Sequence, residues 1–273
     1  TQEILTKFGF VDYELMLSTR PEKAVGSDEI WEKATAALEG ALIRKEWKYG
    51  VDEGGGAFYG PKVDITVFDA LKRRFQCATV QLDFQLPIRF GLKYVDHENK
   101  PQKPVIVHRA ILGSVERMYA ILTEHFAAKW PFWLSPRQVM VVPISDKAAD
   151  YAVEVKASLR AAGFHVDVDL RDLKMQKKVR EAQISYYNYI LVCGEKEKEA
   201  RTVNVRTRDN KVHGEHQIAS LVEVLAKEKA SRSLESLFES ELAGELEKKL
   251  TEACSNEPLM SRTSPDGAHG RAG

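Results

Sequence analysis

The sequence contains little cysteine, no surplus of charge of either sign and no long apolar run. Its three cysteines, Cys77, Cys193 and Cys254, are odd in number and far apart. This favours reduced thiols in a cytosol-like compartment over a disulfide framework. Forty basic residues balance forty acidic ones, so a nucleic-acid site would have to be a local patch. No apolar run approaches the length that spans a bilayer, so nothing predicts a membrane role.

Two domains are expected from the length of 273 residues and from a break in the pattern. Residues 129–138, "KWPFWLSPRQ", contain two prolines, which end the regular pattern on either side. We therefore predict one domain over 1–134 and a second over 135–230. Residues 231–273 are predicted to begin as a helix, to about 250, and to become a disordered tail from about 255, where Ser, Gly and Pro predominate.

The first region is predicted to be an antiparallel sheet backed by helices. Ser27 is a plausible N-cap, and the residues after it have helical apolar spacing. Two alternating segments within 62–87 flank the charged bend "DALKRR" and are expected to pair antiparallel. Strict alternation in the second segment would put Phe75, Cys77, Thr79 and Gln81 on one face. A third strand, "PVIVH", leads into a helix after Gly113.

The second region has a different order of strand-like and helical segments. Strand-like and helical segments alternate from "QVMVVPI" (138–144) to "IASLVEVLAKEKA" (218–230). Such alternation predicts an α/β domain with a largely parallel sheet. The fold class expected for the chain is therefore an α+β antiparallel sheet followed by an α/β domain.

Taken alone, the polar residues of the first region leave several interpretations open. His108 at a strand end is more often a core or capping residue than a ligand. Arg117 could pair with Glu116 or clamp a phosphate, for which its fork of donors is suited. The segment "GGGAFYGPK" is either a hairpin turn or a backbone that approaches a ligand closely. It matches neither a Walker A loop nor a dinucleotide fingerprint, and no C-x-x-C pair predicts a metal finger.

In the second region, "RDLKMQKKVR" (171–180) is a local basic segment. Five of its residues are basic and Asp172 is its single acid. Such a run is usually a solvated helix face, but it is also what phosphate binding needs.

Four separate segments, in order, carry a family resemblance. "LSTRPEKAVGSDEIW", "GAFYGPK", "CATVQLDFQLPIRF" and "VIVHRAILGSVERM" together resemble the later half of the catalytic domain of threonyl-tRNA synthetases, which are class II aminoacyl-tRNA synthetases. "ILVCGEKE" and "NVRTRDNKVHGE" resemble the anticodon-binding domain of the same family. The resemblance extends from the start to about residue 230.

The resemblance implies roles for particular residues of the first region. Arg117, in a segment like class II motif 3, would clamp a phosphate of ATP, used with Mg²⁺, and Lys62 would be the second catalytic cation. Gln76 and Ser114 would lie around the adenylate. His108 would be one of three protein ligands of a zinc ion. The threonine pocket would be formed by Tyr59, Cys77, Thr79, Gln81 and Ala110.

For the second region, the resemblance implies contacts with the anticodon of tRNA(Thr). The implied residues are Lys174, Arg180, Lys196, Glu197 and Arg206. Arginine offers paired donors and glutamate accepts from base amino groups, so these side chains suit exposed loop bases. The implied partners are tRNA(Thr), threonine and ATP, with a homodimer in the complete enzyme. A cytoplasmic location is expected, with a mitochondrial form as the alternative.

Class II motifs 1 and 2 and the other two zinc ligands of this family belong before Thr1, so the chain is expected to be an incomplete portion of the enzyme. On this interpretation it is part of a threonine–tRNA ligase that makes threonyl-adenylate and then threonyl-tRNA, and it would be inactive in isolation. One alternative is a non-catalytic tRNA-binding module derived from a synthetase. Another is a structural or regulatory protein that uses the fold without either ligand.

Overall fold

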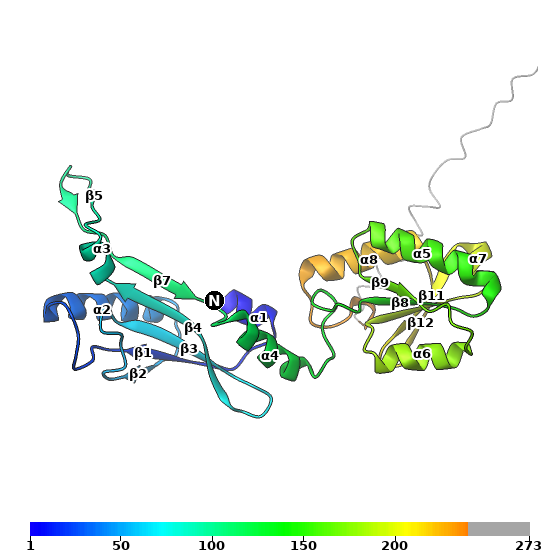
Figure 1. The fold of residues 1–273 in the computed structure, drawn as a ribbon, viewed down its shortest axis with the longest axis horizontal. Coiled ribbons are helices and arrows are strands. Elements are labelled where there is room, and N and C mark those ends of the chain that lie inside the picture. Colours follow the sequence, from blue (N-terminus) through cyan, green and yellow to red (C-terminus); the bar gives the residue numbers. More distant parts are fainter. Residues whose placement is uncertain (240–273) are drawn as a thin grey trace, which may run out of the picture. The chain divides into compact units, whose positions relative to one another are not determined.

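Two units make up the chain in the computed structural model, which describes residues 1–239. The first unit is Thr1–Trp130, and the second begins at Pro131 (Figure 1). Each unit has a β-sheet and an apolar core of its own. The division therefore falls inside the proline-containing segment 129–138.

The first unit is built on a sheet of five strands in the order β2-β1-β3-β4-β7. All neighbouring pairs are antiparallel except β1 with β2. Its elements are α1 (Gln2–Lys7), β1 (Tyr13–Ser18), α2 (Asp28–Arg44), β2 (Gly50–Asp52), β3 (Lys62–Phe68), β4 (Arg74–Asp83), α3 (Gln85–Arg89), β5 (Tyr94–Val95), β6 (Pro101–Gln102), β7 (Ile106–Ala110) and α4 (Val115–Phe126).

One face of this sheet is apolar and carries the helices. Leu15 of β1 and Ile65 of β3 are register partners and lie in one buried cluster. The same cluster contains Leu38 of α2 and Ile121 of α4. Because side chains alternate between faces, the odd-numbered residues of β3 build this core, while the even-numbered ones point to the other side. The helices α1, α2 and α4 thus share one face of the sheet.

The opposite face is lined with polar side chains. Register partners in antiparallel strands share a face, so the pairing identifies its members. Lys62 pairs with Gln81, which pairs with His108, and Asp64 pairs with Thr79, which pairs with Ala110. We call this the polar face, and its residues include Ser18, Lys62, Asp64, Thr66, Gln76, Thr79, Gln81, Asp83, His108 and Ala110.

The strict alternation predicted for residues 75–81 is wrong at Cys77. Ile65 pairs with Ala78, but Thr66 pairs with Gln76, so Cys77 is the extra residue of a β-bulge. A bulge reverses the facing of the residues beyond it. Gln76 therefore joins the polar face, and Cys77 is buried in the apolar cluster, 2% exposed.

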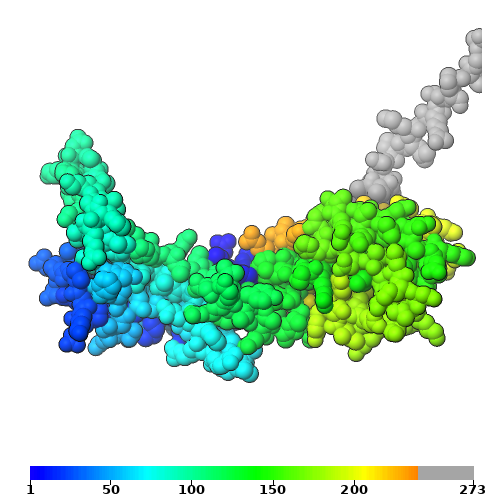
Figure 2. Space-filling view, viewed as in Figure 1, coloured from blue at the N-terminus to red at the C-terminus, as the bar shows by residue number. Residues whose placement is uncertain are grey.

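The segment between β4 and β7 forms structure that the sequence patterns did not predict. It contains the short helix α3 and a small hairpin of β5 with β6. This hairpin projects from the surface of the first unit (Figures 1 and 2). The strands are only two residues long, so no hydrophobic periodicity could have revealed them.

The second unit contains a five-stranded sheet in the order β12-β11-β10-β8-β9. The strands β9, β8 and β10 run parallel, whereas β11 and β12 are antiparallel additions, so the sheet is mixed and less parallel than predicted. The elements are β8 (Val139–Pro143), α5 (Ala149–Ala161), β9 (Val166–Val168), α6 (Met175–Ile184), β10 (Tyr189–Cys193), α7 (Glu195–Ala200), β11 (Thr202–Thr207), β12 (Val212–Gln217) and α8 (Ile218–Ser231), with 3-10 turns at Asp146–Ala148 and Leu237–Glu239.

Helices cover both faces of this second sheet. Leu191 of β10 lies in one cluster with Val155 of α5 and Leu225 of α8. Ile190, the neighbouring residue, points to the other face and packs with Val179 of α6. Figure 1 shows α5 and α8 on one side of the sheet and α6 on the other. This explains why β10 is apolar at every position, since all five residues are buried.

The helix predicted from residue 232 is not observed over residues 232–236, because α8 ends at Ser231 and a 3-10 turn follows at Leu237–Glu239. Phe238 is buried against the rings of Tyr189, His213 and His216. The buried carboxylate of Glu228 accepts hydrogen bonds from the Leu237 backbone N–H and from the Tyr189 hydroxyl. These contacts stabilise a chain reversal instead of a longer helix. The rest of the predicted helix and tail, with Cys254, lies outside the described residues.

Candidate active site in the first unit

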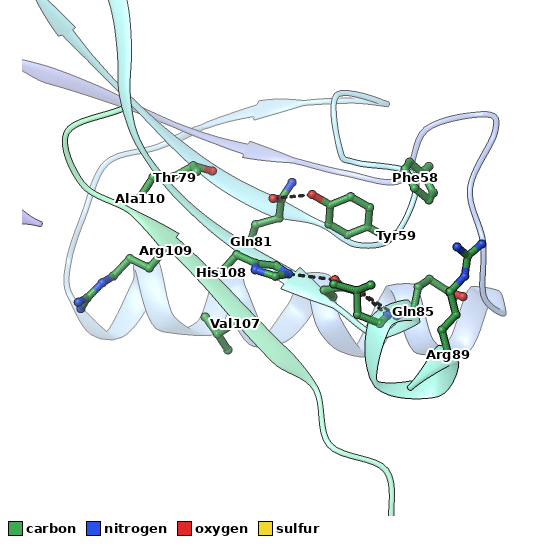
Figure 3. Close-up of a pocket in the computed structure, with 12 residues that line it drawn as sticks. Phe58, Tyr59, Thr79, Gln81, Gln85, Arg89, Val107, His108, Arg109 and Ala110 are labelled. Carbon is green, nitrogen blue, oxygen red and sulfur yellow. Dashed lines mark hydrogen bonds and ion pairs between the residues drawn. The ribbon is translucent and has the colours of Figure 1, made fainter. Parts of the chain in front are cut away.

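A pocket of about 700 Å³ opens over one end of the polar face (Figure 3). Its walls come from the turn before β3, the end of β4, the helix α3 and the strand β7. Five residues predicted for the site line it together: Tyr59, Thr79, Gln81, His108 and Ala110. The remaining lining residues are Phe58, Asp83, Gln85, Leu86, Arg89, Val107 and Arg109.

The glycine-rich turn holds Tyr59 over the pocket. The Tyr59 hydroxyl donates a hydrogen bond of 2.9 Å to Oε1 of Gln81 (Figure 3). At Gly60 the turn passes so close to β4 that an added Cβ would lie 1.9 Å from the Leu82 carbonyl oxygen. Glycine is therefore required at position 60 by close approach of two backbones. The close approach of Gly60 to Leu82 therefore sets the distance between the Tyr59 and Gln81 side chains.

His108 is held from the side of β4. Its Nε2 lies 2.9 Å from Oδ2 of Asp83, whose carboxylate is almost fully buried. Burial by itself raises the pKa of the Asp83 carboxyl. The bonds from His108 and from the backbone N–H groups of Leu86 and Gln85 outweigh that effect and hold this pKa below its ordinary value. Asp83 is thus an ionised acceptor at neutral pH.

Lys62 is paired within the polar face. Its Nζ lies 2.6 Å from Oδ2 of Asp64, and both side chains are mostly buried. The other carboxylate oxygen of Asp64 and the hydroxyl of its register partner Thr79 are buried without a hydrogen-bond partner among the described residues. Buried polar atoms are nearly always paired, so these two atoms are an exception that lies beneath the polar face. Lys62 itself does not line the pocket.

The start of α4 brings Arg117 to the bulge in β4. The Ser114 hydroxyl caps the helix by accepting from the Arg117 backbone N–H at 3.1 Å. Gly113 has a φ of +71°, and an added Cβ there would lie 3.3 Å from the Cys77 carbonyl oxygen. The Arg117 guanidinium donates to the Gln76 carbonyl at 3.1 Å. One guanidinium N–H group of Arg117 is thus held by a backbone carbonyl, while the side chain remains exposed.

Sequence reasoning missed several residues of the pocket, of which Asp83 has the clearest structural role. Asp83 follows Gln81 by two residues and so shares its face. Its Oδ1 accepts from the backbone N–H groups of Gln85 and Leu86 at the start of α3. An aspartate followed within three residues by a helix start is a capping signal that the sequence contained. Gln85 and Arg89 carried no such signal.

The implied zinc can be tested against the side chains present. Within residues 1–239, no three His, Cys, Asp or Glu side chains gather closely enough to hold a metal ion. Among the described residues, the Asp83 carboxylate lies within hydrogen-bond distance of His108. Catalytic zinc sites use three protein ligands, so the described residues of this chain do not form one by themselves.

The candidate anticodon residues of the second unit lie on several elements. Lys174 is the N-cap of α6 and Lys196 lies on α7, both at the edge where the parallel strands end, and both are exposed. Arg206 of β11 pairs with Ile190 and so points to the face that α6 partly covers. Glu197 is engaged locally, because its carboxylate accepts the Gly194 backbone N–H at 2.8 Å. Arg180 is exposed on α6.

Not all of the basic segment 171–180 is available to a ligand. The Arg171 guanidinium donates to the carboxylates of Asp169 and Glu181, each at 2.6 Å. These bonds raise the pKa of Arg171 above its ordinary value, and Asp169 also accepts the Arg171 backbone N–H. Lys178 is buried. Arg171 is exposed but held by two carboxylates, and the other exposed cations of the segment are Lys174, Lys177 and Arg180.

Comparison with known proteins accounts for both units. Residues 1–126 match the family model for the tRNA synthetase class II core domain (G, H, P, S and T), and residues 138–228 match the model for the anticodon binding domain. The chain is 58% identical over 217 residues to a mitochondrial threonine–tRNA ligase of Arabidopsis thaliana, and 56% identical over 232 residues to the cytoplasmic threonine–tRNA ligase 1 of Rattus norvegicus. The chain belongs to the threonyl-tRNA synthetase family.

A solved structure agrees with this assignment. The RNA binding domain of threonyl-tRNA synthetase from Cryptosporidium parvum is 44% identical with a TM-score of 0.79, and the match covers 86% of this chain and 58% of that one. The matches with the two ligases cover 79% and 84% of this chain, but it spans only 30% and 33% of their length. Among the described residues, no helix of this synthetase chain is long and apolar enough to cross a membrane.

Proposed function

We propose that this chain is a portion of a threonine–tRNA ligase, which activates threonine with ATP to threonyl-adenylate and transfers it to tRNA(Thr). The observation that carries the proposal is the convergence of distant segments on one pocket. Tyr59 from the glycine turn, Gln81 from β4 and His108 from β7 are far apart in sequence and line the same cavity. Membership of a family of threonine–tRNA ligases supplies the reaction.

The cations of the first unit are suited to the nucleotide. Arg117 would clamp a phosphate of ATP, because an exposed guanidinium fixed by the Gln76 carbonyl is already oriented. Lys62, held by Asp64, would be the second cation. The adenylate would lie near Gln76 and Ser114 at the start of α4. Use of ATP with Mg²⁺ is what a class II core implies.

The polar floor of the pocket fits an amino acid that bears a hydroxyl group. A site with polar groups that need partners rejects an analogue lacking the hydroxyl far better than an apolar pocket does. The Thr79 hydroxyl, the Gln81 amide and the Tyr59 hydroxyl provide such groups, with Ala110 beside them and Cys77 in the core beneath. His108 would give one ligand to a zinc ion whose other ligands lie outside residues 1–239.

The second unit would bind the anticodon stem and loop of tRNA(Thr). Lys174 and Arg180 are exposed cations suited to phosphates of the stem, and Lys196, Glu197 and Arg206 would contact bases. The local engagement of Glu197 leaves one of its carboxylate oxygens for this purpose. We place the enzyme in the cytoplasm, as for several of its relatives, and expect the complete enzyme to be a homodimer.

The experiment that tests this function starts from the native polypeptide that carries this sequence, captured from its source with an antibody against residues 129–235. Intact mass shows its length, and threonine-dependent exchange of pyrophosphate into ATP shows its activity. We expect a mass well above 30.8 kDa and exchange with threonine. A longer polypeptide that exchanges with no amino acid would contradict the proposal.

A non-catalytic tRNA-binding module is the second candidate. It is favoured by the second unit, which has a core of its own and carries the candidate RNA contacts. A native species of 30.8 kDa that binds tRNA(Thr) without exchange activity would support it.

A further inference from the structure

Asp83 joins two parts of the pocket through its two carboxylate oxygens. Oδ1 accepts from the backbone N–H groups of Gln85 at 2.8 Å and Leu86 at 3.0 Å, and so begins α3. Oδ2 lies 2.9 Å from Nε2 of His108. Its side chain is 2% exposed. Water therefore cannot replace either set of partners, and Asp83 is confined to this orientation.

The contact with His108 has a defined polarity. An ionised carboxylate only accepts hydrogen bonds, so the proton between Oδ2 and Nε2 belongs to the imidazole. A neutral imidazole that carries its proton on Nε2 has an unprotonated Nδ1 with a free lone pair. The His108 side chain is 41% exposed and lines the pocket, so the ring remains accessible from that side.

Neighbouring groups are oriented in the same manner. Gln81, the register partner of His108, receives the Tyr59 hydroxyl proton on Oε1. The amide is thereby turned so that its Nε2 group is the donor left over. Gln81 thus offers the N–H groups of its Nε2, and the neighbouring His108 offers the lone pair of its Nδ1.

We propose that Asp83 is a positioning residue that keeps the proton of His108 on Nε2 and so directs the Nδ1 lone pair toward the pocket. Nδ1 then binds an electron-pair acceptor, either a metal ion or an N–H or O–H group of the substrate. The inference rests on the proposed function for what enters the pocket, but the state of His108 can be measured without it. Asp83 acts only through His108 and through the start of α3.

The tautomer of His108 can be read directly by NMR of the chain labelled with ¹⁵N-histidine. Protonated and unprotonated ring nitrogens have well-separated ¹⁵N shifts, and the His108 signals are identified by their loss in His108→Gln. We expect the neutral ring of His108, observed above the pH at which it titrates, to carry its proton on Nε2 and none on Nδ1. A proton on Nδ1 would overturn the proposal, and this measurement requires no Asp83 variant to fold.

Asp83→Asn tests the cause. The asparagine side-chain oxygen can still accept from the backbone N–H groups of Gln85 and Leu86, so α3 should persist. Its amide group, however, offers N–H to His108 in place of a lone pair. The proton of His108 should therefore move to Nδ1, and an unchanged tautomer would overturn the proposal.

The matched control is Asp69→Asn in the same unit. The Asp69 carboxylate is also fully buried and accepts two backbone N–H groups, those of Leu71 at 2.9 Å and Arg73 at 2.8 Å. It pairs with the Arg73 side chain and not with a histidine. This variant should leave the His108 tautomer unchanged. A shift of the His108 proton in Asp69→Asn as large as in Asp83→Asn would overturn the proposal.

The consequence for activity is measured in the complete polypeptide. Loss of a partner that orients a ligand typically costs 10- to 100-fold, so threonine-dependent exchange should fall about that much in Asp83→Asn and stay unchanged in Asp69→Asn. An unchanged rate in Asp83→Asn would overturn the proposal while the proposed function stands. Absence of exchange in the unmodified polypeptide would overturn the proposed function alone, since the tautomer still decides the role of Asp83.

Discussion

Both faces of the sheet in the second unit are covered by helices, whereas in the first unit α1, α2 and α4 gather on one face. The other face of the first sheet carries Lys62, Asp64, Gln81 and His108 at paired positions. Its β7 is an edge strand of the described sheet, and Val107 on it is 58% exposed. In the second unit the central strand β10 has no exposed residue.

In the second unit both faces of the sheet serve packing, whereas in the first unit one face serves packing and the other carries the candidate site. The second unit gains stability from a core closed on both sides, and its candidate RNA contacts are surface side chains added to that scaffold. The first unit places polar and charged groups over an apolar sheet, and it leaves Asp64 Oδ1 and Thr79 Oγ unpaired among the described residues. Sites that bind and react commonly give up local stability in this manner. The following substitutions test the comparison.

The largest expected effect separates the chemical roles of the two units. Arg117→Ala in the complete polypeptide should lower threonine-dependent pyrophosphate exchange by about 10² to 10³, the usual loss for one donor that stabilises developing charge, and should spare tRNA binding. Arg206→Ala should weaken tRNA charging about 10-fold with exchange nearly intact. A loss of exchange in Arg206→Ala as large as its loss of charging, or weakened tRNA binding in Arg117→Ala, would contradict the division of roles.

The glycine turn should be nearly as sensitive. In Gly60→Ala the new Cβ cannot remain 1.9 Å from the Leu82 carbonyl, so the turn must move and separate Tyr59 from Gln81. We expect the KM for threonine to rise about 10- to 100-fold, as for other displacements of about 1 Å in a site. Gly40→Ala is the control, because that Cβ would meet only the end of Arg44 and should stabilise α2 by about 0.5–1 kcal/mol. A Gly60→Ala enzyme with an unchanged KM would show that the turn does not position Tyr59.

The contrast in packing between the two units can be tested by comparing the stability of Val205→Ala and Val107→Ala. Val205 of β11 is fully buried, so Val205→Ala should lower the free energy of unfolding of the second unit by about 2 kcal/mol. Val107→Ala, at an exposed edge position, should change that of the first unit by less than about 0.5 kcal/mol. Hydrogen exchange of the amides in each unit measures both values. Similar losses would mean that the edge of the first sheet is packed in solution.

The smallest expected effect is a pH dependence in the second unit. The hydrogen bond from Arg171 holds the pKa of Asp169 below its ordinary value of 3.8. A lowered pKa in the folded state stabilises the unit above that value, and the stabilisation is lost as the pH falls through the folded pKa. Acid unfolding of Asp169→Asn should therefore be less steep below about pH 4 than that of the unmodified chain. Asp172→Asn, exposed in the same loop, is the control and should unfold as the unmodified chain does.

Much of the fold followed from periodicity. The strands at residues 62–68 and 74–83, the helix after Ser27 and the strand–helix alternation of the second region are all present. The missed helices and strands are short or lack a pattern: α1, α3, α7, β2, β5, β6 and β12. The mixed sheet of the second unit was also missed, because the direction of β11 depends on its pairing with β10.

Part of the candidate site could be read from residue types, and part could not. Tyr59, Gln81 and His108 were predicted and line one pocket, whereas Asp83 was not predicted and holds His108. The facing of Cys77 was mistaken because a bulge changes alternation by one residue, and no sequence period contains that information. The hydrogen bonds of Arg171 with Glu181 and of Glu197 with the Gly194 N–H likewise depend on how the chain folds.

The sequence by itself determined the family, the two-unit division and the chemical types available, since these depend on motif order, on prolines and on hydrophobic period. Only the tertiary structure decided which side chains meet. Register between β3, β4 and β7 aligned Lys62, Gln81 and His108 in one row, and the passage of Gly60 over Leu82 placed Tyr59 above it. These contacts join residues far apart in the chain, and their distances are set by backbone pairing and packing rather than by any local pattern.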